Sequence, residues 1–270
     1  MHRKVTDTRK FALVTGGSSG MGLEYARQLA DDGFDLLLVS IQPDELARAK
    51  DSLEKDYGIN VITRFQDLAS AGAADDLLAF CKAGNIIPDV LVCNAGMFFF
   101  KELTPELLGR AEAMVNLHVL TNTKLAILFG DEMKKRGSGR IILMSSMAAK
   151  LPTPGIAVYS ATKAYLKSFG KSLWFEMRPY GVDVTTVCPA AIATPLYKLK
   201  PSLMDIGVKL GVIKTPEWLV KRALKASARG RRVISPSFMN IYLPPLIRLL
   251  PGPIENKLWL KFRHSTRSSG

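Results

Sequence analysis

The apolar residues of this chain of 270 residues fall into short continuous runs, separated by stretches in which apolar positions recur every three or four residues. Short continuous runs are typical of strands that are covered on both faces of a sheet. A recurrence of three or four is typical of amphipathic helices. The runs predict strands at Phe11–Thr15, Asp35–Ser40, Asn60–Gln66, Val90–Cys93, Arg140–Ser145, Val182–Val187 and Arg232–Ser235.

Helices are predicted in the stretches between these strands. The segment Thr104–Arg136 holds either one long helix or two, and its Thr104-Pro105 start is typical of a helix N-terminus. Strands that alternate with helices indicate an α/β fold, here a Rossmann-like doubly wound parallel sheet of about seven strands with helices on both faces. The other predicted helices span Met21–Asp32, Pro43–Tyr57, Ala73–Lys82, Val158–Met177 and Pro216–Ala228.

The chain shows no internal repeat and no low-complexity linker that would divide it. We therefore expect one Rossmann-fold domain over residues 1–235, with a substrate lid at about residues 195–216, followed by an extension over residues 236–270. The extension is rich in proline, in basic residues and in large apolar residues such as Leu250 and Trp259. It either packs on the core, covers the substrate cleft, joins an oligomer interface or lies on a lipid surface.

The composition, with 47% hydrophobic and 23% charged residues, excludes a disordered chain. Cys81, Cys93 and Cys188 are too few and too scattered for a disulfide framework or a metal cluster, so we expect core thiols in a reducing compartment and no metal site. No run reaches the ~20 apolar residues of a spanning helix, and the polar, basic N-terminus is unlike a secretory signal. We expect a cytoplasmic protein.

The net charge of +13 is concentrated near the C-terminus. Residues 206–270 contain 13 Lys or Arg and 2 acidic residues, so +11 of the charge lies there. This asymmetry indicates either peripheral contact with an anionic membrane surface or a phosphate-bearing substrate, or simply a solvated basic face. The sequence has no zinc finger or aromatic RNA-binding signature, and we expect no nucleic-acid partner.

A glycine-rich turn, Thr15-Gly16-Gly17-Ser18-Ser19-Gly20-Met21-Gly22, lies between the first predicted strand and the first predicted helix. Glycines at positions 16, 20 and 22 permit positive φ angles and a close approach of backbone to a pyrophosphate. The N-terminus of the helix adds backbone N–H groups and a positive dipole end, which favour phosphate. The turn therefore predicts a dinucleotide site.

The end of the second strand bears on which nicotinamide cofactor is bound. Dinucleotide sites for NAD usually place a carboxylate there, on the ribose 2′-hydroxyl. Here the strand ends in Ser40-Ile41-Gln42, with no acid before Asp44. The missing carboxylate favours NADP, with Ser40 and Gln42 as contacts to the 2′-phosphate. An arginine that would pair with this phosphate is also missing, so NAD stays the alternative.

Tyr159 and Lys163 lie four residues apart at the start of a predicted helix, and therefore on one face of it. A free phenol ionises near pKa ~10 and is a poor base at neutral pH, but a neighbouring ammonium stabilises phenolate. Tyr159 is thus a candidate general acid and base. Ser146, thirteen residues before it at a strand end, is the candidate for hydrogen bonding the substrate oxygen, and Ser145 is its competitor.

These motifs, in this order, resemble those of the short-chain dehydrogenase/reductase family. The glycine turn matches the family's Thr-Gly-x-x-x-Gly-x-Gly, and Ser146 and the Tyr159–Lys163 pair match its catalytic residues. Asn94-Ala95-Gly96 and the segment from Pro189 to Thr194 match two further motifs, with Ala190 in place of the usual glycine. The resemblance implies hydride transfer between NADP(H), or NAD(H), and a carbonyl or alcohol, and a homodimer or homotetramer.

The resemblance also implies a role for each site residue. The backbone carbonyl of Asn116 would hold a water that links Lys163 to solvent, and Lys163 would bond the nicotinamide ribose. We expect Asn116 to be buried, and His118 to be a structural rather than a catalytic histidine. The expected catalytic residues are Asn116, Ser146, Tyr159 and Lys163. The expected cofactor contacts are Gly16, Ser18, Ser19, Gly20, Met21, Ser40, Gln42, Asp67, Leu68, Asn94, Ala95, Gly96, Tyr159, Lys163, Pro189, Ile192 and Thr194.

Apolar residues around the site indicate the kind of substrate. The segment after Thr194 and the run Met97–Phe100 are strongly apolar, which favours a hydrophobic ketone or alcohol such as an acyl chain, a sphingoid-like lipid or a steroid. The chain is similar to reductases of the 3-oxoacyl or long-chain hydroxysteroid type. The alternatives are ordinary lid packing, an NAD(H) enzyme for a small polar alcohol or sugar, and a non-catalytic nucleotide-sensing regulator.

Overall fold

The protein is described by a computed structural model over residues 10–151, 153–190, 192 and 213–237, with isolated positions between 242 and 260. Seven parallel strands form one sheet in the order β3-β2-β1-β4-β5-β6-β7, which confirms the predicted doubly wound sheet. The strand order reverses between β1 and β4, and this switch point is where such sheets bind ligands. The strands are β1 (Phe11–Thr15), β2 (Asp35–Ser40), β3 (Val61–Phe65), β4 (Val90–Cys93), β5 (Gly139–Met144), β6 (Val182–Val187) and β7 (Val233–Ile234).

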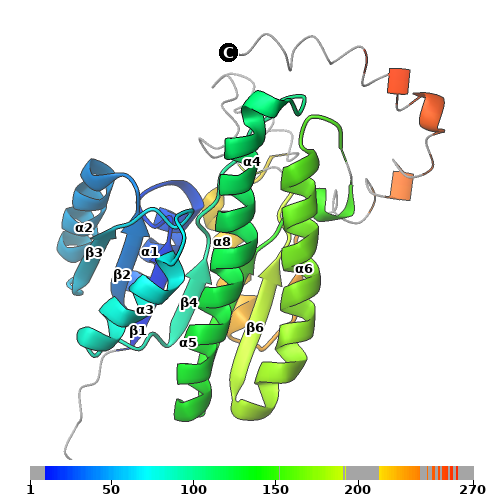
Figure 1. The fold of residues 1–270 in the computed structure, drawn as a ribbon. Coiled ribbons are helices and arrows are strands. Elements are labelled where there is room, and N and C mark those ends of the chain that lie inside the picture. Colours follow the sequence, from blue (N-terminus) through cyan, green and yellow to red (C-terminus); the bar gives the residue numbers. More distant parts are fainter. Residues whose placement is uncertain are drawn as a thin grey trace, which may run out of the picture.

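Helices cover both faces of the sheet (Figure 1). Along β2, Leu36 and Leu38 pack into one hydrophobic core, and Leu37 and Val39 pack into the other, because successive side chains of a strand point to opposite faces. The first core is closed by α1 (Gly20–Asp31), α2 (Pro43–Tyr57) and α8 (Pro216–Ser227), and the second by α3 (Ala73–Ala83), α5 (Asn122–Arg136) and α6 (Ala157–Met177).

The long helical segment before β5 is interrupted once. It begins with a 3-10 turn (Pro105–Leu107) and continues as α4 (Leu108–Val115), the π-helical turn η2 (Asn116–Thr121) and α5, which Figure 1 shows as one rod. A π-turn leaves a carbonyl without its usual helical partner. Here the side-chain amide of Asn122 donates to the carbonyl of His118 over 3.2 Å.

Several expectations concern parts of the chain outside the described residues. These include the predicted lid from residue 195 to residue 212 and most of the extension from residue 238 onward. The division into domain, lid and extension therefore stays a prediction. Cys81, Cys93 and Cys188 are all buried, as expected of core thiols. No helix within the described ranges is long and apolar enough to cross a membrane.

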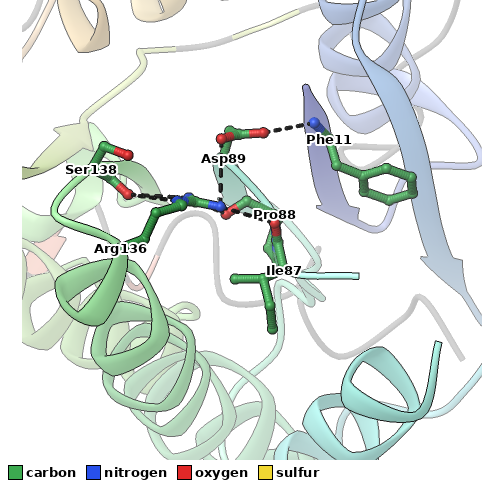
Figure 2. A network of polar contacts seen from close by, with 6 residues as sticks. All are labelled: Phe11, Ile87, Pro88, Asp89, Arg136 and Ser138. Atoms are coloured by element: carbon green, nitrogen blue, oxygen red, sulfur yellow. Dashed lines mark hydrogen bonds and ion pairs between the residues drawn. The ribbon is translucent and has the colours of Figure 1, made fainter. Parts of the chain in front are cut away.

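A polar network at the amino ends of the strands holds α5 to the sheet (Figure 2). The guanidinium of Arg136 donates to the backbone carbonyls of Pro88 at 2.9 Å and Ser138 at 3.1 Å. It also pairs with Asp89, with 3.5 Å between Nη1 and Oδ1. The other oxygen of Asp89 accepts the backbone N–H of Phe11 over 2.8 Å. Arg136 thus links the end of α5 to the start of β4, and Asp89 extends the link to the start of β1.

We predict that Arg136→Met destabilises the fold by about 1–2 kcal/mol, because it leaves backbone carbonyls and Asp89 without their donor. Thermal unfolding measures this loss as a fall in Tm. The matched control is Lys135→Met, next to it, which removes the pairs of an exposed lysine with Asp131 and Glu132 on its own helix and should change little. Equal Tm values for the two variants would show that the network adds no stability.

Candidate active site

A cavity of about 280 Å³ opens at the carboxyl ends of the strands, at the switch point between β1 and β4. Its walls combine loops that follow six different strands, β1 to β6, with the start of α6. Thr194 lies outside the described residues, and Asn116 and Ser146 do not line the cavity within the described ranges. The expected cofactor contacts that do line it are Gly16, Ser18, Ser19, Gly20, Met21, Ser40, Gln42, Asp67, Leu68, Asn94, Ala95, Gly96, Tyr159, Lys163, Pro189 and Ile192.

The glycine turn has the backbone that a pyrophosphate cradle requires. Gly16 and Gly20 have φ angles of +65° and +53°, which side-chain-bearing residues rarely adopt. A Cβ on Gly22 would collide with the carbonyl oxygen of Gly16, so the first turn of α1 packs closely on the loop. Because α1 begins at Gly20 on the cavity wall, its N-terminal N–H groups and dipole favour an anion there. The site therefore fits a dinucleotide.

Thr15 and Asn94 hold the first and fourth strand ends together. The Thr15 hydroxyl donates to the Val92 carbonyl over 3.2 Å and accepts the backbone N–H groups of Asn94 and Ala95, each over 3.0 Å. The Asn94 side chain donates in return to the carbonyls of Thr15 at 3.1 Å and Gly16 at 3.3 Å. These bonds fix the two loops that form the cavity floor.

The end of β2 has a carboxylate nearby that the sequence reasoning missed. Glu45, in the first turn of α2, accepts a hydrogen bond from the Ser18 hydroxyl over 3.0 Å. The same hydroxyl lies 2.9 Å from that of Ser40, which also accepts the backbone N–H of Gln42 over 3.3 Å. The strand end Ser40-Ile41-Gln42 itself carries no acid, as expected, but a carboxylate from the following helix lies beside Ser18. The signal was present in the sequence, because acids in the first turn of a helix that starts beside the pocket lie close to it.

Tyr159 and Lys163 are both buried at the start of α6. The Lys163 ammonium donates to the carbonyl of Met144 over 2.9 Å and lies 5.5 Å from the centre of the Tyr159 ring. Burial lowers the pKa of Lys163 to about 8. The Tyr159 ring meets Phe98 edge to face, with 5.0 Å between ring centres. The predicted pair thus lies together on the cavity wall.

The two candidate serines have different hydrogen bonds. Ser145 donates its hydroxyl proton to the backbone carbonyl of Lys163 over 2.8 Å. Ser146, at the N-cap of the 3-10 turn η3 (Met147–Lys150), accepts the Ala148 N–H over 3.1 Å, a bond that leaves its own proton available to donate. This difference favours Ser146 as the donor to a substrate oxygen.

We predict that Ser146→Ala lowers kcat by about 10²-fold, as the loss of one donor to a developing oxyanion does. Ser145→Ala is the matched control. It should mainly lower Tm, since its hydroxyl holds α6 to the end of β5. A larger kcat loss for Ser145→Ala at unchanged Tm would reverse the assignment of the two serines.

Asn116 opens the π-turn η2, and its side chain is only partly buried, so the expectation of a buried asparagine is wrong. The physical reason is the π-turn, which directs Leu117 and His118 inward instead. The water-holding role of Asn116 stays a prediction. His118 is buried with both ring nitrogens hydrogen-bonded, as expected of a structural histidine.

Two described residues of the segment after β6, Pro189 and Ile192, line the cavity. The Pro189 carbonyl accepts the N–H of Met147 over 2.7 Å, which ties this segment to the turn that carries Ser146. Ile192 is buried and forms a bridge with Lys214.

A separate apolar cluster adjoins Tyr159. Phe99 and Met114 are buried against it, and Met97, Phe98, Leu107, Ala148, Ile156 and Val158 pack around them. Of this cluster, Tyr159 and Met97 also line the cavity.

A doubly wound sheet with a dinucleotide cavity and a buried Tyr–Lys pair on its wall defines a nicotinamide-dependent oxidoreductase. Residues 10–202 match the family model described as short chain dehydrogenase. The chain therefore belongs to the short-chain dehydrogenase/reductase family, whose members act on carbonyl and hydroxyl groups with NAD(P).

Similar proteins cover nearly the whole chain. The very-long-chain 3-oxoacyl-CoA reductase of Rattus norvegicus is 32% identical over 266 residues, and that of Homo sapiens is 30% identical over 266 residues. Each alignment covers 96% of this chain and 81% of the relative. A short-chain dehydrogenase from Sphingobium yanoikuyae, solved in complex with NADPH, is 25% identical with a TM-score of 0.76, over 90% of this chain and 97% of that one.

Proposed function

We propose that this protein reduces the ketone of a long-chain 3-oxoacyl thioester to a secondary alcohol, with NADPH as reductant. The observation that carries the proposal is the buried Tyr159–Lys163 pair on the wall of the dinucleotide cavity, where Tyr159 also packs in the apolar cluster around Phe99. The similarity to very-long-chain 3-oxoacyl-CoA reductases supports this substrate class.

Different residues along the cavity would hold successive parts of the cofactor. The glycine turn would bind the pyrophosphate, Asp67 and Leu68 the adenine, and Ser40 with Gln42 the 2′-phosphate. Lys163 would bond the nicotinamide ribose. Pro189, Ile192 and Thr194 would hold the nicotinamide. When bound, NADPH supplies the hydride that reduces the carbonyl carbon.

The chain itself supplies the proton and the charge stabilisation. Tyr159 donates its phenolic proton to the ketone oxygen, and Ser146 donates a hydrogen bond to that oxygen as negative charge develops on it. The Lys163 ammonium stabilises the phenolate that Tyr159 leaves. A water at the Asn116 carbonyl then returns a proton from solvent through Lys163.

A substrate panel tests the proposal. NADPH and NADH oxidation would be followed with short- and long-chain 3-oxoacyl thioesters, a steroid ketone and a small sugar ketone. We expect the highest kcat/KM for NADPH with the long-chain thioester. A preference for NADH with the sugar ketone would favour the polar-substrate alternative. Cofactor binding without any turnover would favour a nucleotide-sensing regulator, and either result would overturn the proposal.

The burial of Lys163 gives a pH prediction. Its pKa of about 8 should rise when the ammonium bonds the ribose of an anionic cofactor. Binding therefore takes up a proton, and NADPH affinity should fall about tenfold between pH 7 and pH 9. Lys163→Met should remove the fall, and this variant distinguishes Lys163 from the neighbouring groups Cys188, His118 and Tyr159. An equal slope in wild type and variant would contradict the prediction.

Peripheral contact of the basic C-terminal residues with anionic membranes, and a homodimer or homotetramer, are further parts of the proposed function. The concentration of positive charge in residues 206–270 supports the membrane contact. Sedimentation with anionic and with neutral vesicles tests it, and equal sedimentation would contradict it.

A further inference from the structure

His118 lies between the two structural parts of the candidate active site. The backbone N–H of Met97 donates to its Nε2 over 3.0 Å, and its Nδ1 lies 3.0 Å from the Thr162 hydroxyl on α6. Met97 belongs to the loop after β4 that lines the cofactor cavity, and Thr162 lies between Tyr159 and Lys163. One buried imidazole thus connects the cofactor loop to the tyrosine helix.

The hydrogen bonds fix which ring nitrogen carries the proton. Nε2 accepts from a backbone N–H and therefore has no proton, so the neutral ring is protonated on Nδ1. Nδ1 then donates to Thr162, whose hydroxyl in turn donates to the backbone carbonyl of Tyr159 over 2.9 Å. Burial, followed by the charge of Lys163, lowers the pKa of His118 well below its ordinary value, which keeps the ring neutral.

The packing around the ring adds a steric constraint. A Cβ on Gly96 would lie 3.1 Å from Nε2, so the absence of a side chain there lets the loop approach the imidazole. The imidazole faces the Tyr159 ring edge to face, with 5.9 Å between ring centres. Phe98, next to Met97, contacts the same tyrosine ring. The loop after β4 and the Tyr159 ring therefore both pack against the His118 side chain.

We propose that His118, as an imidazole protonated on Nδ1, is a positioning residue that fixes the cofactor loop relative to Tyr159 through Thr162. The kinetic part of this proposal rests on the proposed reductase function. Small displacements of reacting groups cost large factors in rate, so a loosened link should lower kcat more than cofactor affinity.

Paired variants test the hydrogen bond of His118 to Thr162 separately from its hydrogen bond to Met97. His118→Gln can accept from Met97 but cannot reach Thr162, and Thr162→Val removes the hydroxyl at nearly constant volume. We expect each to lower kcat about tenfold while the Kd for NADPH changes by less than about twofold. Thr162→Ser keeps the hydroxyl and should retain kcat within about twofold. The double variant should be no slower than the single ones, because both break one chain of bonds.

Two results would overturn the proposal. One is an unchanged kcat in Thr162→Val, or a loss of kcat in Thr162→Val that Thr162→Ser shares. This test does not need the His118→Gln variant to fold. The other is a nitrogen NMR spectrum of the wild-type protein that shows His118 charged at neutral pH or protonated on Nε2. The NMR result does not depend on turnover, so a failure of the reductase function is distinguished from a failure of the positioning role.

Discussion

Tyr159→Phe is expected to lower kcat by about 10²- to 10⁴-fold, which is the range that a positioned general acid contributes. The substitution removes one oxygen and keeps the ring that packs against Phe98 and His118. The fold and the cofactor cavity should therefore persist. The Kd for NADPH, measured by fluorescence, should change by less than about threefold, while single-turnover NADPH oxidation slows by the full factor.

Tyr165→Phe is the matched control for this experiment. Tyr165 lies on the same helix, but its side chain is 39% exposed and its hydroxyl lies 2.9 Å from that of Thr123, away from the cavity. Its loss should leave kcat within about twofold of the wild type. If Tyr159→Phe retained full turnover, the proton would have to come from another group, and the proposed mechanism would be wrong.

The central strands were predictable from the sequence because they are covered on both faces. Every side chain of β4, from Val90 to Cys93, is buried, so the apolar run and the strand coincide. The cofactor loops were predictable for a related reason. Glycines at 16 and 20 occupy positive φ angles, and these backbone constraints are visible in residue type alone.

Features that depend on contacts between distant elements were not predictable. The π-turn η2 has no local signal, because Asn116–Thr121 has ordinary helical spacing, and its effect on which side chains face inward depends on α6 and the β4 loop. The hydrogen bond from the Lys163 ammonium to the Met144 carbonyl likewise requires the packing of α6 on β5. Neither contact can be derived from residue spacing.

The hydrogen bond between Glu45 and Ser18 changes the argument about cofactor choice. A carboxylate disfavours a nearby phosphate, and this one is bonded to a serine whose hydroxyl lies beside that of Ser40. We therefore expect the protein to bind NADPH more tightly than NADH, and we expect Glu45 to make this difference smaller. Glu45→Gln should tighten NADPH binding by about three- to tenfold and change NADH binding little, since only NADPH carries the 2′-phosphate.

Gln42→Asp should act in the opposite direction and more strongly. Gln42 is exposed on the cavity rim, and a carboxylate there would add to the charge of Glu45. A unit charge within about 6 Å of a phosphate dianion costs about 1.4 kcal/mol in a water-like medium and more in the protein. The Kd for NADPH should therefore rise by about 10- to 100-fold while that for NADH stays within about threefold.

Asp44→Asn is the control for both cofactor variants, because Asp44 is exposed in the same first turn of α2. Titration of each variant with NADPH, NADH and 2′-phospho-adenosine diphosphate ribose isolates the 2′-phosphate from the nicotinamide. Equal weakening of NADPH and NADH by Gln42→Asp would place the 2′-phosphate elsewhere. An unchanged NADPH affinity in Glu45→Gln would show that the Ser18 hydroxyl, by holding the carboxylate, turns its charge away from the cofactor.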